Sequence, residues 1–466
     1  MNDSYDFVVI GGGSAGYAGA SMAARHGLET VVIEGAEEVG GLCILRGCMP
    51  SKTLLESSRR AESIRRAAEF GLRAEYRGAD GPAIRARKRQ LIGEFADYRR
   101  QQLENGPFTF LRGVAAFVDP QTVEVRLKEG GVQRISGRAF LLATGSHVKH
   151  VPVPGLKETG CWTSDEVLDA GHIPASVVVL GAGAIGLELA SFYEGVGSRV
   201  TVIQRGGQVM KELDADLAHA LTHAMERRGI RILLNTTLTR VERKGGSKCV
   251  HFQQQGSEHR VEAEEIIYAL GRKPNVEGLA LEKARIAGKG CVVASPTQQT
   301  NQPHIFAAGD VCSPIEVVHV AVQQGELAAR NAARLLGRRA GELERMDYAL
   351  KLFVGFTQPE VATVGLGENE AADAGQDFVV AKFPFSDHGK ALVRGETEGF
   401  VKLIAERTTR RLIGGAVVGP EAAELIHEIV MAMRFGATAG QLATTPHYHP
   451  TLSEIWTYPA EALAES

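Results

Sequence analysis

Apolar runs and glycine turns occur twice along this chain, in two stretches that repeat one another. In the first stretch, an apolar strand at residues 6–10 runs into a glycine turn, a helix of small residues up to Gly27, and a second strand at 30–34. In the second stretch, a strand at 177–180 runs into a glycine turn, a helix up to Gly197, and a strand at 199–204. Each stretch therefore predicts one βαβ nucleotide-binding unit.

The glycines of both turns have the spacing GxGxxG. They are Gly11, Gly13 and Gly16 in the first copy, and Gly181, Gly183 and Gly186 in the second. The first glycine of this motif permits the tight turn, the second lets backbone approach a pyrophosphate, and the third lets helix and strand pack closely. A lone motif is weak evidence, but each copy here lies between a predicted strand and a predicted helix, which is the context that the motif requires.

The last residue of each second strand indicates the nucleotide. Glu34 and Gln204 each lie 23 positions after the first glycine of their turn. A carboxylate accepts hydrogen bonds from a ribose 2′-hydroxyl but repels the 2′-phosphate of NADP, whereas the neutral Gln204 is followed by the cations Arg205 and Lys211. We therefore expect NADP to be favoured over NAD in the second unit. The alternative is that both cations are solvated loop residues.

Cys43 and Cys48 form the cysteine pattern that indicates chemistry. Their segment predicts a glycine loop and then a long helix that begins near Pro50, so the dipole at the helix N-terminus would stabilise a Cys48 thiolate. Zinc binding is the alternative, but no second cysteine pair completes the usual four ligands, and we predict no metal. The other cysteines are scattered singly and are expected to be inert: Cys161, Cys249, Cys291 and Cys312.

The segment GGLCILRGCMPSK, which follows the first nucleotide-binding stretch, resembles the redox-disulfide segment of the pyridine nucleotide-disulfide oxidoreductases. The resemblance covers the whole chain. It implies that the first unit holds FAD and the second holds the nicotinamide nucleotide, that Cys48 faces the flavin, and that Cys43 exchanges with the substrate. It also implies that Lys52 approaches the flavin and is paired with Glu188.

Further segments follow in the order of that family. Thr144 and Gly145 close a strand before the second unit, and Gly271 and Arg272 close the second unit. In the sequence FAAGD, the resemblance implies that Asp310 binds the ribityl chain of FAD, although Gly followed by Asp is by itself only a turn.

The C-terminal third, from about Met346, has shorter strands and one amphipathic helix without a glycine fingerprint. It looks like the interface domain of the family, which implies a symmetric homodimer. The segment HPTLSE matches the family's catalytic segment, so His449 is implied to act as acid/base on the cysteines of the opposite subunit, with Glu454 orienting it. His447 fits the HxHP arrangement of dihydrolipoamide dehydrogenases, and its role stays open.

These elements predict an α/β fold with two Rossmann-like βαβ nucleotide-binding domains, for FAD and NAD(P), and a C-terminal α+β dimerisation domain. At 466 residues the chain is long enough for about three domains. We expect an FAD-binding domain over 1–148, which contains the redox cysteines, and an NAD(P)-binding domain over 149–270. The FAD-binding domain would return over 271–345, and the dimerisation domain would cover 346–466.

The composition argues against two classes of binding partner. A formal charge of -3, from 52 basic and 55 acidic residues, indicates neither nucleic acid nor an acidic membrane surface. The uncharged stretch 7–24 is interrupted by glycines and follows an acidic start, so we interpret it as part of a cytoplasmic protein rather than as a signal or membrane segment.

The predicted function is that of an FAD-dependent NAD(P)H:disulfide oxidoreductase. Within that family the sequence most resembles the dihydrolipoamide dehydrogenases. The substrate would be a small-molecule disulfide or dithiol, such as a lipoyl group on another protein. Gly19 and Ala20 stand where glutathione reductases carry arginine, and the extra C-terminal cysteine pair of mercuric reductases has no counterpart after Cys312. Leu45 and Arg46 replace the family's usual Asn and Val, and the role of Arg46 stays open.

Three alternatives remain at this point. The first is a flavin-dependent NADPH quinone reductase or diaphorase that bypasses the cysteines. The second is a reductase of another low-molecular-weight disulfide, and the third, which is not an enzyme, is a redox sensor that holds FAD. The sequence leaves open the physiological substrate, the direction of electron flow and membership of a larger complex.

Overall fold

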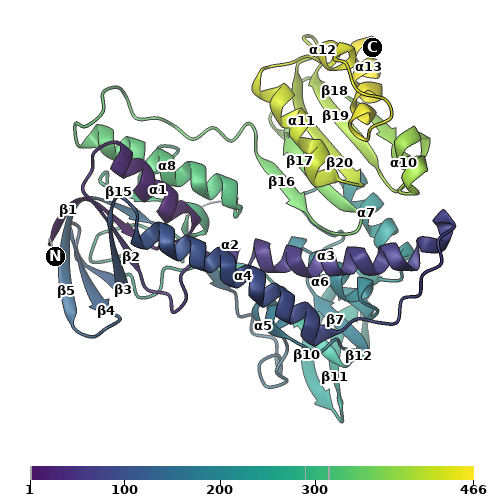
Figure 1. Ribbon diagram of the computed structural model, residues 1–466, viewed down its shortest axis with the longest axis horizontal. Coiled ribbons are helices and arrows are strands. Elements are labelled where there is room, and N and C mark those ends of the chain that lie inside the picture. The colour runs from purple at the N-terminus through teal and green to yellow at the C-terminus, as the bar shows by residue number, and fades with distance from the viewer. Residues whose placement is uncertain (1–2, 289, 313–314, 466) are drawn as a thin grey trace. The chain divides into compact units, whose positions relative to one another are not determined.

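The chain divides into two compact units in a computed structural model, which describes residues 3–288, 290–312 and 315–465 (Figure 1). The first unit consists of residues 1–51, 86–150 and 271–347, and the second of residues 52–85, 151–270 and 348–466. Two long helices pass from one unit into the other, α3 (Cys48–Arg65) and α4 (Gly81–Glu104).

The sheet of the first unit is built around parallel strands. Its strands are β1 (Ser4–Ile10), β2 (Thr30–Glu34), β3 (Thr109–Asp119), β4 (Thr122–Leu127), β5 (Val132–Leu142) and β15 (Ile305–Ala307). β1 lies between β2 and β5, β3 continues the parallel order beyond β2, and β15 continues it beyond β5. β4 pairs antiparallel with both β3 and β5. β1 and β2 contain the uninterrupted apolar runs 7–10 and 31–33, because parallel strands are covered on both faces.

Helices cover this sheet and leave its glycine turn accessible at the end of β1. They are α1 (Ser14–Arg25), the short α2 (Gly41–Leu45) and α8 (Val318–Leu335), with a 3₁₀ turn η2 (Gly309–Val311) before α8. α1 and α8 lie side by side (Figure 1) because Gly19 faces the backbone of Gly325, and a Cβ on Gly19 would lie 3.1 Å from its carbonyl oxygen. A small antiparallel ribbon joins β6 (Ser146–Val148) to β14 (Arg272–Pro274).

The second unit contains a parallel sheet in the order β13-β7-β8-β9. These strands are β7 (Ser176–Leu180), β8 (Arg199–Ile203), β9 (Arg231–Leu233) and β13 (Glu265–Tyr268), and the helices that accompany them are α5 (Ser164–Asp169), α6 (Ala184–Gly195) and α7 (Ala215–Arg227). An antiparallel three-stranded sheet follows α7, made of β10 (Thr236–Lys244), β11 (Ser247–Gln254) and β12 (Ser257–Ala263).

The C-terminal part of the second unit forms an antiparallel sheet in the order β16-β17-β20-β19-β18. Its strands are β16 (Leu352–Gly355), β17 (Glu360–Gly365), β18 (Phe378–Pro384), β19 (Phe400–Glu406) and β20 (Leu412–Gly419). Its helices are α9 (Glu368–Asp373), α10 (Gly389–Arg394), α11 (Ala422–Arg434), α12 (Ala439–Thr444) and α13 (Thr457–Glu465). α11 packs on β17 and β20, and α13 packs on β18 and β19 around the fully buried Trp456.

The fold class predicted from the sequence is confirmed. Both repeats form a strand, a helix and a parallel strand at the predicted places, and the C-terminal third is a mixed α+β region without a glycine turn. Within the residues that the structure describes, helices that combine the length and the apolar character for a membrane crossing do not occur.

Candidate active site

The first glycine turn connects β1 to α1 and ends at a helix N-terminus without a side-chain cap. Gly11 has a φ of +106°, a backbone conformation that strains any residue with a side chain. A Cβ on Gly16 would overlap the carbonyl oxygen of Gly11, so only glycine lets α1 pack this closely on the turn. The N-cap of α1 is Gly13, which has no side chain to occupy the first N–H groups of the helix, and these groups attract negative charge.

Glu34, at the end of β2, is bound to the same turn. Its side chain is 8% exposed, and its two carboxylate oxygens accept backbone N–H groups from Gly12 at 2.8 Å and Ala36 at 2.7 Å. Each oxygen keeps a further lone pair, so the carboxylate can still accept hydrogen bonds from a ribose hydroxyl. The structure thus places Glu34 beside the glycine turn, as the sequence predicts.

The segment with Cys43 and Cys48 lies against the first turn. Gly41 approaches so closely that a Cβ on it would lie 2.7 Å from the Cα of Gly13. Cys43 lies in α2, and Cys48 is the first residue of α3, which places its thiol at a helix N-terminus. A Cβ on Gly47 would lie 3.2 Å from the Cα of Cys43, so the chain returns beside Cys43 just before Cys48.

The helix after the cysteines begins earlier than the sequence predicts. The expected start was near Pro50, whereas α3 begins at Cys48 and the expected glycine loop contains the short helix α2. Proline is tolerated in the first helical turn because an N–H group there has no intrahelical partner. Pro50 therefore lies in the first turn of α3 but is not its first residue.

Three segments that are distant in sequence meet in the first unit around a hydroxyl group. The Oγ of Ser146 donates to Asp310 at 2.6 Å, and it accepts the Nε of Arg272 at 2.9 Å. Thr144, two residues earlier, donates its hydroxyl to the carbonyl oxygen of Asn275 at 2.7 Å. The predicted residues Arg272 and Asp310 are therefore joined through Ser146, whereas the predicted Thr144 contacts Asn275 separately. The sequence did not indicate Ser146, and Asn275 ends the segment YALGRKPN, of which Gly271 and Arg272 were the predicted site residues.

Gly145 and Gly271 flank that network. Both have a positive φ, +71° and +105°, in the turns at the two ends of the ribbon between β6 and β14. The N–H of Asn275 donates to the carbonyl oxygen of Gly145 at 2.8 Å, and the N–H of Lys149 donates to that of Gly271 at 3.0 Å.

In the second unit, Lys52 and Glu188 form the ion pair that the family resemblance implies. The Nζ of Lys52 lies 2.8 Å and 2.9 Å from the two carboxylate oxygens of Glu188, which is 6% exposed. The N–H of Phe356 also donates to Glu188, at 3.1 Å, and the Lys52 ammonium lies 4.4 Å from the centre of the Phe356 ring. This arrangement fixes the ammonium group while leaving about a third of the Lys52 side chain exposed.

The second glycine turn, between β7 and α6, has the same form as the first. Gly181 has a φ of +99°, Gly183 is the exposed N-cap of α6, and a Cβ on Gly186 would overlap the carbonyl oxygen of Gly181. The Oε1 of Gln204 accepts the N–H of Ala182 at 3.2 Å. The second turn therefore also presents a helix N-terminus without a side-chain cap, a position that favours negative charge.

The cations predicted to select NADP are exposed on the loop after β8. Arg205 directly follows Gln204, and the Nζ of Lys211 lies 3.7 Å from Glu212. The N–H of Met210 donates to the carbonyl oxygen of Ala182 at 2.8 Å, which holds the loop against the glycine turn just before Lys211.

His449 and Glu454 are paired in the C-terminal part of the second unit. The Nδ1 of His449 lies 3.0 Å from the Oε2 of Glu454, and 78% of the histidine side chain is exposed while the glutamate is buried. The Nε2 of the same ring is therefore the nitrogen that is available for proton transfer. His447 is paired separately, with its Nε2 2.6 Å from the Oε1 of Glu428.

His388 is a residue of this site that the sequence did not indicate. It is fully buried, and its Nε2 lies 3.4 Å from the second carboxylate oxygen of Glu454. Burial lowers the pKa of His388, against the opposing effect of the Glu454 charge. A lone histidine outside a motif offers no signal from which this contact could be predicted.

Arg46, whose role the sequence left open, pairs with Glu38 on the surface at 3.2 Å. Among the four scattered cysteines, burial raises the pKa of the Cys161 thiol to about 11 and that of the Cys312 thiol to about 12. These two thiols stay protonated at neutral pH and are poor nucleophiles, as predicted.

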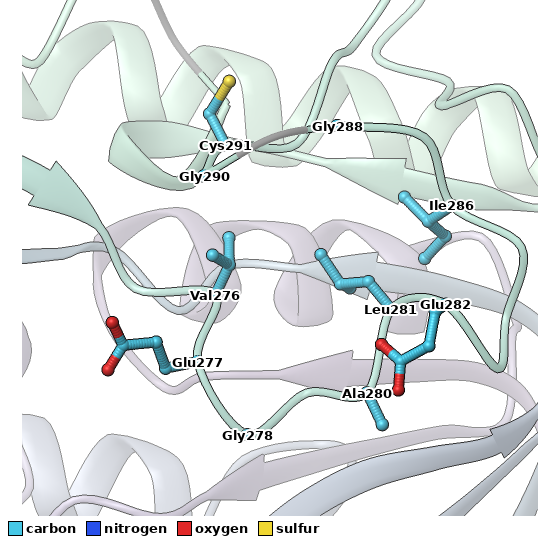
Figure 2. A pocket seen from close by; sticks show the side chains of 10 residues that line it. All are labelled: Val276, Glu277, Gly278, Ala280, Leu281, Glu282, Ile286, Gly288, Gly290 and Cys291. Atoms are coloured by element: carbon cyan, nitrogen blue, oxygen red, sulfur yellow. The ribbon is translucent and has the colours of Figure 1, made fainter.

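A pocket in the first unit is lined by residues from Val276 to Cys291 and includes the carboxylates of Glu277 and Glu282 (Figure 2). The residues predicted to bind cofactor or to carry the chemistry do not line it. In the first unit the candidate site residues lie instead at the glycine turn and in the cysteine segment.

Comparisons with known proteins agree with this geometry. Residues 5–325 match the pyridine nucleotide-disulphide oxidoreductase domain, and residues 353–460 match the dimerisation domain of pyridine nucleotide-disulphide oxidoreductases. The chain is 34% identical to the dihydrolipoyl dehydrogenase of Chlamydia muridarum, over 98% of this chain and 96% of the relative. It is 33% identical to the mercuric reductase of Bacillus cereus, over 97% of this chain and 70% of that relative.

A solved structure extends the similarity to three dimensions. The copper(II) complex of the HOCl-induced flavoprotein disulfide reductase RclA of Escherichia coli superposes with a TM-score of 0.86, at 25% identity, and the match covers 99% of this chain and 100% of that chain. The two glycine turns, the cysteine segment and the C-terminal sheet all lie within the matched regions. The chain therefore belongs to the pyridine nucleotide-disulphide oxidoreductase family.

Proposed function

We propose that this chain is an FAD-dependent NAD(P)H:disulfide oxidoreductase that exchanges electrons with its substrate through Cys43 and Cys48. The observation that carries the proposal is the packing of Gly41 on Gly13, which brings the cysteine segment against the first glycine turn. Similarity to dihydrolipoyl dehydrogenases and to a flavoprotein disulfide reductase supports the same activity. A second candidate, a quinone reductase or diaphorase, differs from it only in bypassing the cysteines.

The residues present in the first unit suit FAD. The uncapped N-terminus of α1 suits its pyrophosphate, Glu34 suits a ribose that lacks a 2′-phosphate, and Asp310 suits the hydroxyls of the ribityl chain. Thr144, Gly145, Gly271 and Arg272 complete this site in the proposal. Lys52, held by Glu188, would approach the flavin.

The second unit suits a nicotinamide nucleotide at the N-terminus of α6, and we propose that NADP is preferred. Gln204 is neutral, and its side-chain oxygen is already engaged by the N–H of Ala182. Arg205 and Lys211 are exposed on a loop that Met210 ties to the turn, where a cation would attract a 2′-phosphate.

When bound, the nicotinamide nucleotide and the flavin supply hydride transfer and carry electrons to or from the cysteine pair. In the reducing direction, the thiolate of Cys43 attacks one sulfur of the substrate disulfide, which forms a mixed disulfide and releases the first substrate thiolate. The thiolate of Cys48 then attacks the sulfur of Cys43, which forms the Cys43–Cys48 disulfide and releases the second substrate thiol. The opposite direction follows the same steps in reverse.

His449 supplies the proton that this exchange needs. Because Glu454 holds Nδ1, the exposed Nε2 gives a proton to the departing thiolate, or takes one from an attacking dithiol in the reverse direction. The matched dimerisation domain supports a homodimer, in which we propose that His449 acts on the cysteines of the opposite subunit. The substrate would be a small disulfide or dithiol, and a lipoyl group carried by another protein is the form that the dihydrolipoyl dehydrogenase relatives suggest.

The test is an anaerobic titration of the purified protein with NADPH and, separately, with NADH. We expect a long-wavelength charge-transfer band from the Cys48 thiolate to the flavin, which appears faster with NADPH. Bleaching of the flavin without this band would mean that the cysteines are bypassed, and the quinone reductase candidate would replace the proposal. Full FAD content with negligible turnover of a broad disulfide panel would favour a redox sensor.

Cys43→Ser separates the two enzymatic candidates. Because Cys43 forms the mixed disulfide, the variant should lose disulfide reduction by at least about 100-fold while it keeps reduction of quinones and dyes. The control is Cys291→Ser, which removes an exposed thiol of the same unit and should change neither activity. Equal disulfide reduction by the Cys43→Ser variant and the parent would overturn the proposal.

A further inference from the structure

The antiparallel sheet β10-β11-β12 of the second unit carries a group of reactive side chains on one face. Glu242 of β10 pairs directly with Cys249 of β11, and Cys249 pairs directly with Glu262 of β12. His251 lies two residues after Cys249 on the same strand. Because directly paired residues and residues two apart share a face of a sheet, these side chains all project to one side.

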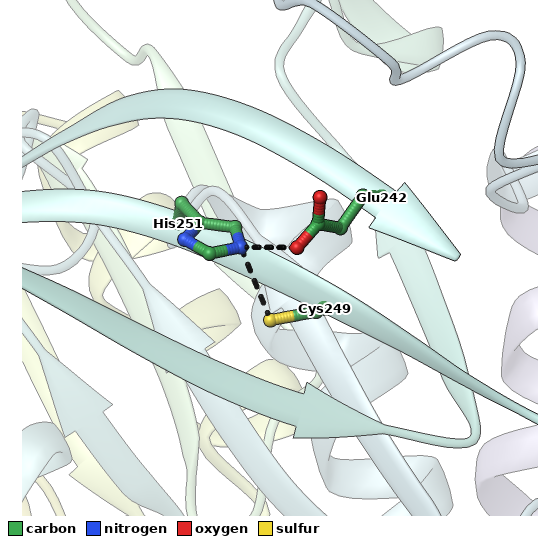
Figure 3. Close-up of side chains that lie close together, drawn as sticks. All are labelled: Glu242, Cys249 and His251. Atoms are coloured by element: carbon green, nitrogen blue, oxygen red, sulfur yellow. Dashed lines mark hydrogen bonds and ion pairs between the residues drawn. The ribbon is translucent and has the colours of Figure 1, made fainter. Parts of the chain in front are cut away.

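Glu242, Cys249 and His251 point toward one another (Figure 3). The Nε2 of His251 lies 2.8 Å from the Oε1 of Glu242 and 3.5 Å from the Sγ of Cys249. The three ligand atoms lie within 4.8 Å of one another. Cys249 is 1% exposed and His251 is 6% exposed, so the cysteine and the histidine are held by the surrounding sheet.

The separation of sulfur and nitrogen is the one that a tetrahedral metal site requires. With metal–sulfur and metal–nitrogen bonds of about 2.3 Å and about 2.05 Å, two ligands of a tetrahedron lie about 3.6 Å apart. The observed distance from Cys249 to His251 is 3.5 Å. The carboxylate of Glu242 is closer to the histidine than a bound metal would allow, so its flexible side chain would have to withdraw by about half an ångström.

Metal binding through Nε2 would change the hydrogen bonds of the histidine. The Nη2 of Arg240 lies 3.3 Å from the Nδ1 of His251, and an arginine can only donate, so the proton of the neutral ring is on Nε2 and is shared with Glu242. A metal ion would displace that proton. The proton would then belong on Nδ1, so the guanidinium of Arg240 would have to withdraw from that nitrogen, and the carboxylate of Glu258, now 3.6 Å away, would have to approach and accept the proton. A carboxylate on the far nitrogen is the usual support of a histidine that binds a metal.

We propose that Glu242, Cys249 and His251 bind a divalent zinc ion on this face of the sheet. Sulfur, imidazole nitrogen and carboxylate oxygen are together the ligands that zinc accepts, and the fourth position is open to water. Binding would release the thiol proton of Cys249.

This site uses residues of β10 and β11 and none of those assigned to cofactor binding or disulfide exchange. Metal binding can therefore be measured without turnover. Absence of metal binding would leave the proposed oxidoreductase activity unaffected, and absence of that activity would leave the proposed metal site unaffected.

The experiment is a titration of the chelator-treated, FAD-containing full chain with Co²⁺, which reports on a thiolate ligand through its near-ultraviolet absorption. We expect one Co²⁺ per chain, with a thiolate-to-cobalt band that Zn²⁺ abolishes at one equivalent. The band should persist in Cys43→Ser, because the proposed site lies apart from the redox cysteines. Absence of the band, or its loss in Cys43→Ser, would overturn the proposal.

Variants locate the ion. Cys249→Ala should abolish the band, and His251→Ala should weaken Co²⁺ binding by at least about 10-fold. The matched control is His259→Ala, because His259 of β12 stacks on Phe252 and lies on the other face of the same sheet. Glu242→Gln preserves size and should also weaken binding, which keeps the test valid if Cys249→Ala folds poorly. Equal affinities in His251→Ala and His259→Ala would overturn the proposal.

Discussion

The two glycine turns have the same backbone and differ in the loop that follows the second strand of each repeat. The N–H of Gly11 donates to the carbonyl oxygen of Ile33 at 2.8 Å, and the N–H of Gly181 donates to that of Ile203 at 2.9 Å. Both turns end in a glycine N-cap, and in both the third glycine permits a backbone contact that a Cβ would block. The backbone of the glycine turns alone therefore does not distinguish the two sites.

The loops distinguish them. After β2 the loop brings Gly41 onto Gly13, and the redox segment with Cys43 follows at once. After β8 the loop returns through the hydrogen bond of Met210 to the turn, and Lys211 follows. The same βαβ arrangement is thus followed by two different connections, one that contains the thiols and one that contains the cations.

Glu34 and Gln204 show that the local backbone also influences which side chain stands at the end of the second strand. Glu34 accepts two backbone N–H groups and needs two acceptor oxygens. Gln204 accepts one, from Ala182, and its amide nitrogen lies 3.4 Å from the carbonyl oxygen of Gln208. A carboxylate suits the first environment and an amide suits the second, before any nucleotide is bound.

The third glycines should give the largest effect. In Gly16→Ala the added methyl group overlaps the backbone of Gly11, which side-chain motion cannot relieve, so the cost exceeds the roughly 1–3 kcal/mol of ordinary overpacking. We expect this variant to lose most of its flavin, measured as the ratio of flavin to protein absorbance. Gly186→Ala should keep its flavin and lose reduction by nicotinamide nucleotides.

A matched control for this pair is Gly93→Ala on α4, where an added Cβ meets open space. It should retain both flavin and nucleotide-dependent reduction. Equal flavin loss from Gly16→Ala and Gly186→Ala would contradict the assignment of different ligands to the two turns.

The repeats and their glycine turns could be predicted from sequence because each depends on neighbours within about thirty residues. The strands, the helices and the places of Glu34 and Gln204 follow from spacing alone. The family resemblance supplied the Lys52–Glu188 pair and the His449–Glu454 pair, both of which the structure shows. The resemblance could do so because both pairs lie within motifs.

The remaining contacts could not be predicted, since they join isolated residues across long separations. Thr144 was predicted as a site residue, but its contact with the carbonyl group of Asn275, 131 residues away, was not. His388, which precedes α10, contacts Glu454, which precedes α13, across a long separation in sequence. Cys249 was predicted to be inert because it stands alone in sequence, whereas the pairing of β10 with β11 sets it beside two other metal-ligand types.

Glu34→Gln should produce the next largest effect. An amide offers one acceptor oxygen to two backbone N–H groups and turns its own NH₂ group toward one of them. Since a hydrogen bond to a charged group contributes about 1.5–3 kcal/mol, the dissociation constant of FAD should rise about 10- to 100-fold, measured by reconstitution of the apoprotein. Glu37→Gln removes an exposed charge from the same loop and should leave FAD affinity unchanged. The same loss in both variants would assign the effect to net charge.

Gln204→Glu makes the second turn resemble the first. A carboxylate there would repel the 2′-phosphate of NADPH and accept a ribose hydroxyl of NADH, so the ratio of kcat/KM for NADPH over NADH should fall about 10-fold. Steady-state kinetics with both nucleotides on the same preparation measures this ratio. An equal fall in kcat/KM for both nucleotides would mean that Gln204 stabilises the turn and does not determine which nucleotide is preferred.

Lys211→Ala should have the smallest effect, a rise of about 2- to 5-fold in the KM for NADPH, because the lysine is exposed and its attraction is screened by solvent and salt. The hydrogen bond from Met210 to Ala182 uses backbone atoms, so the loop keeps its place when the side chain is shortened. The rise in KM should therefore be electrostatic, so it should become smaller as ionic strength increases and should not occur with NADH. The control is Lys157→Ala, which removes another exposed lysine of the second unit and should leave the KM for NADPH unchanged. An equal rise for NADH, or one that salt does not change, would mean that the loop had moved, and the cations would then no longer account for the difference between the two turns.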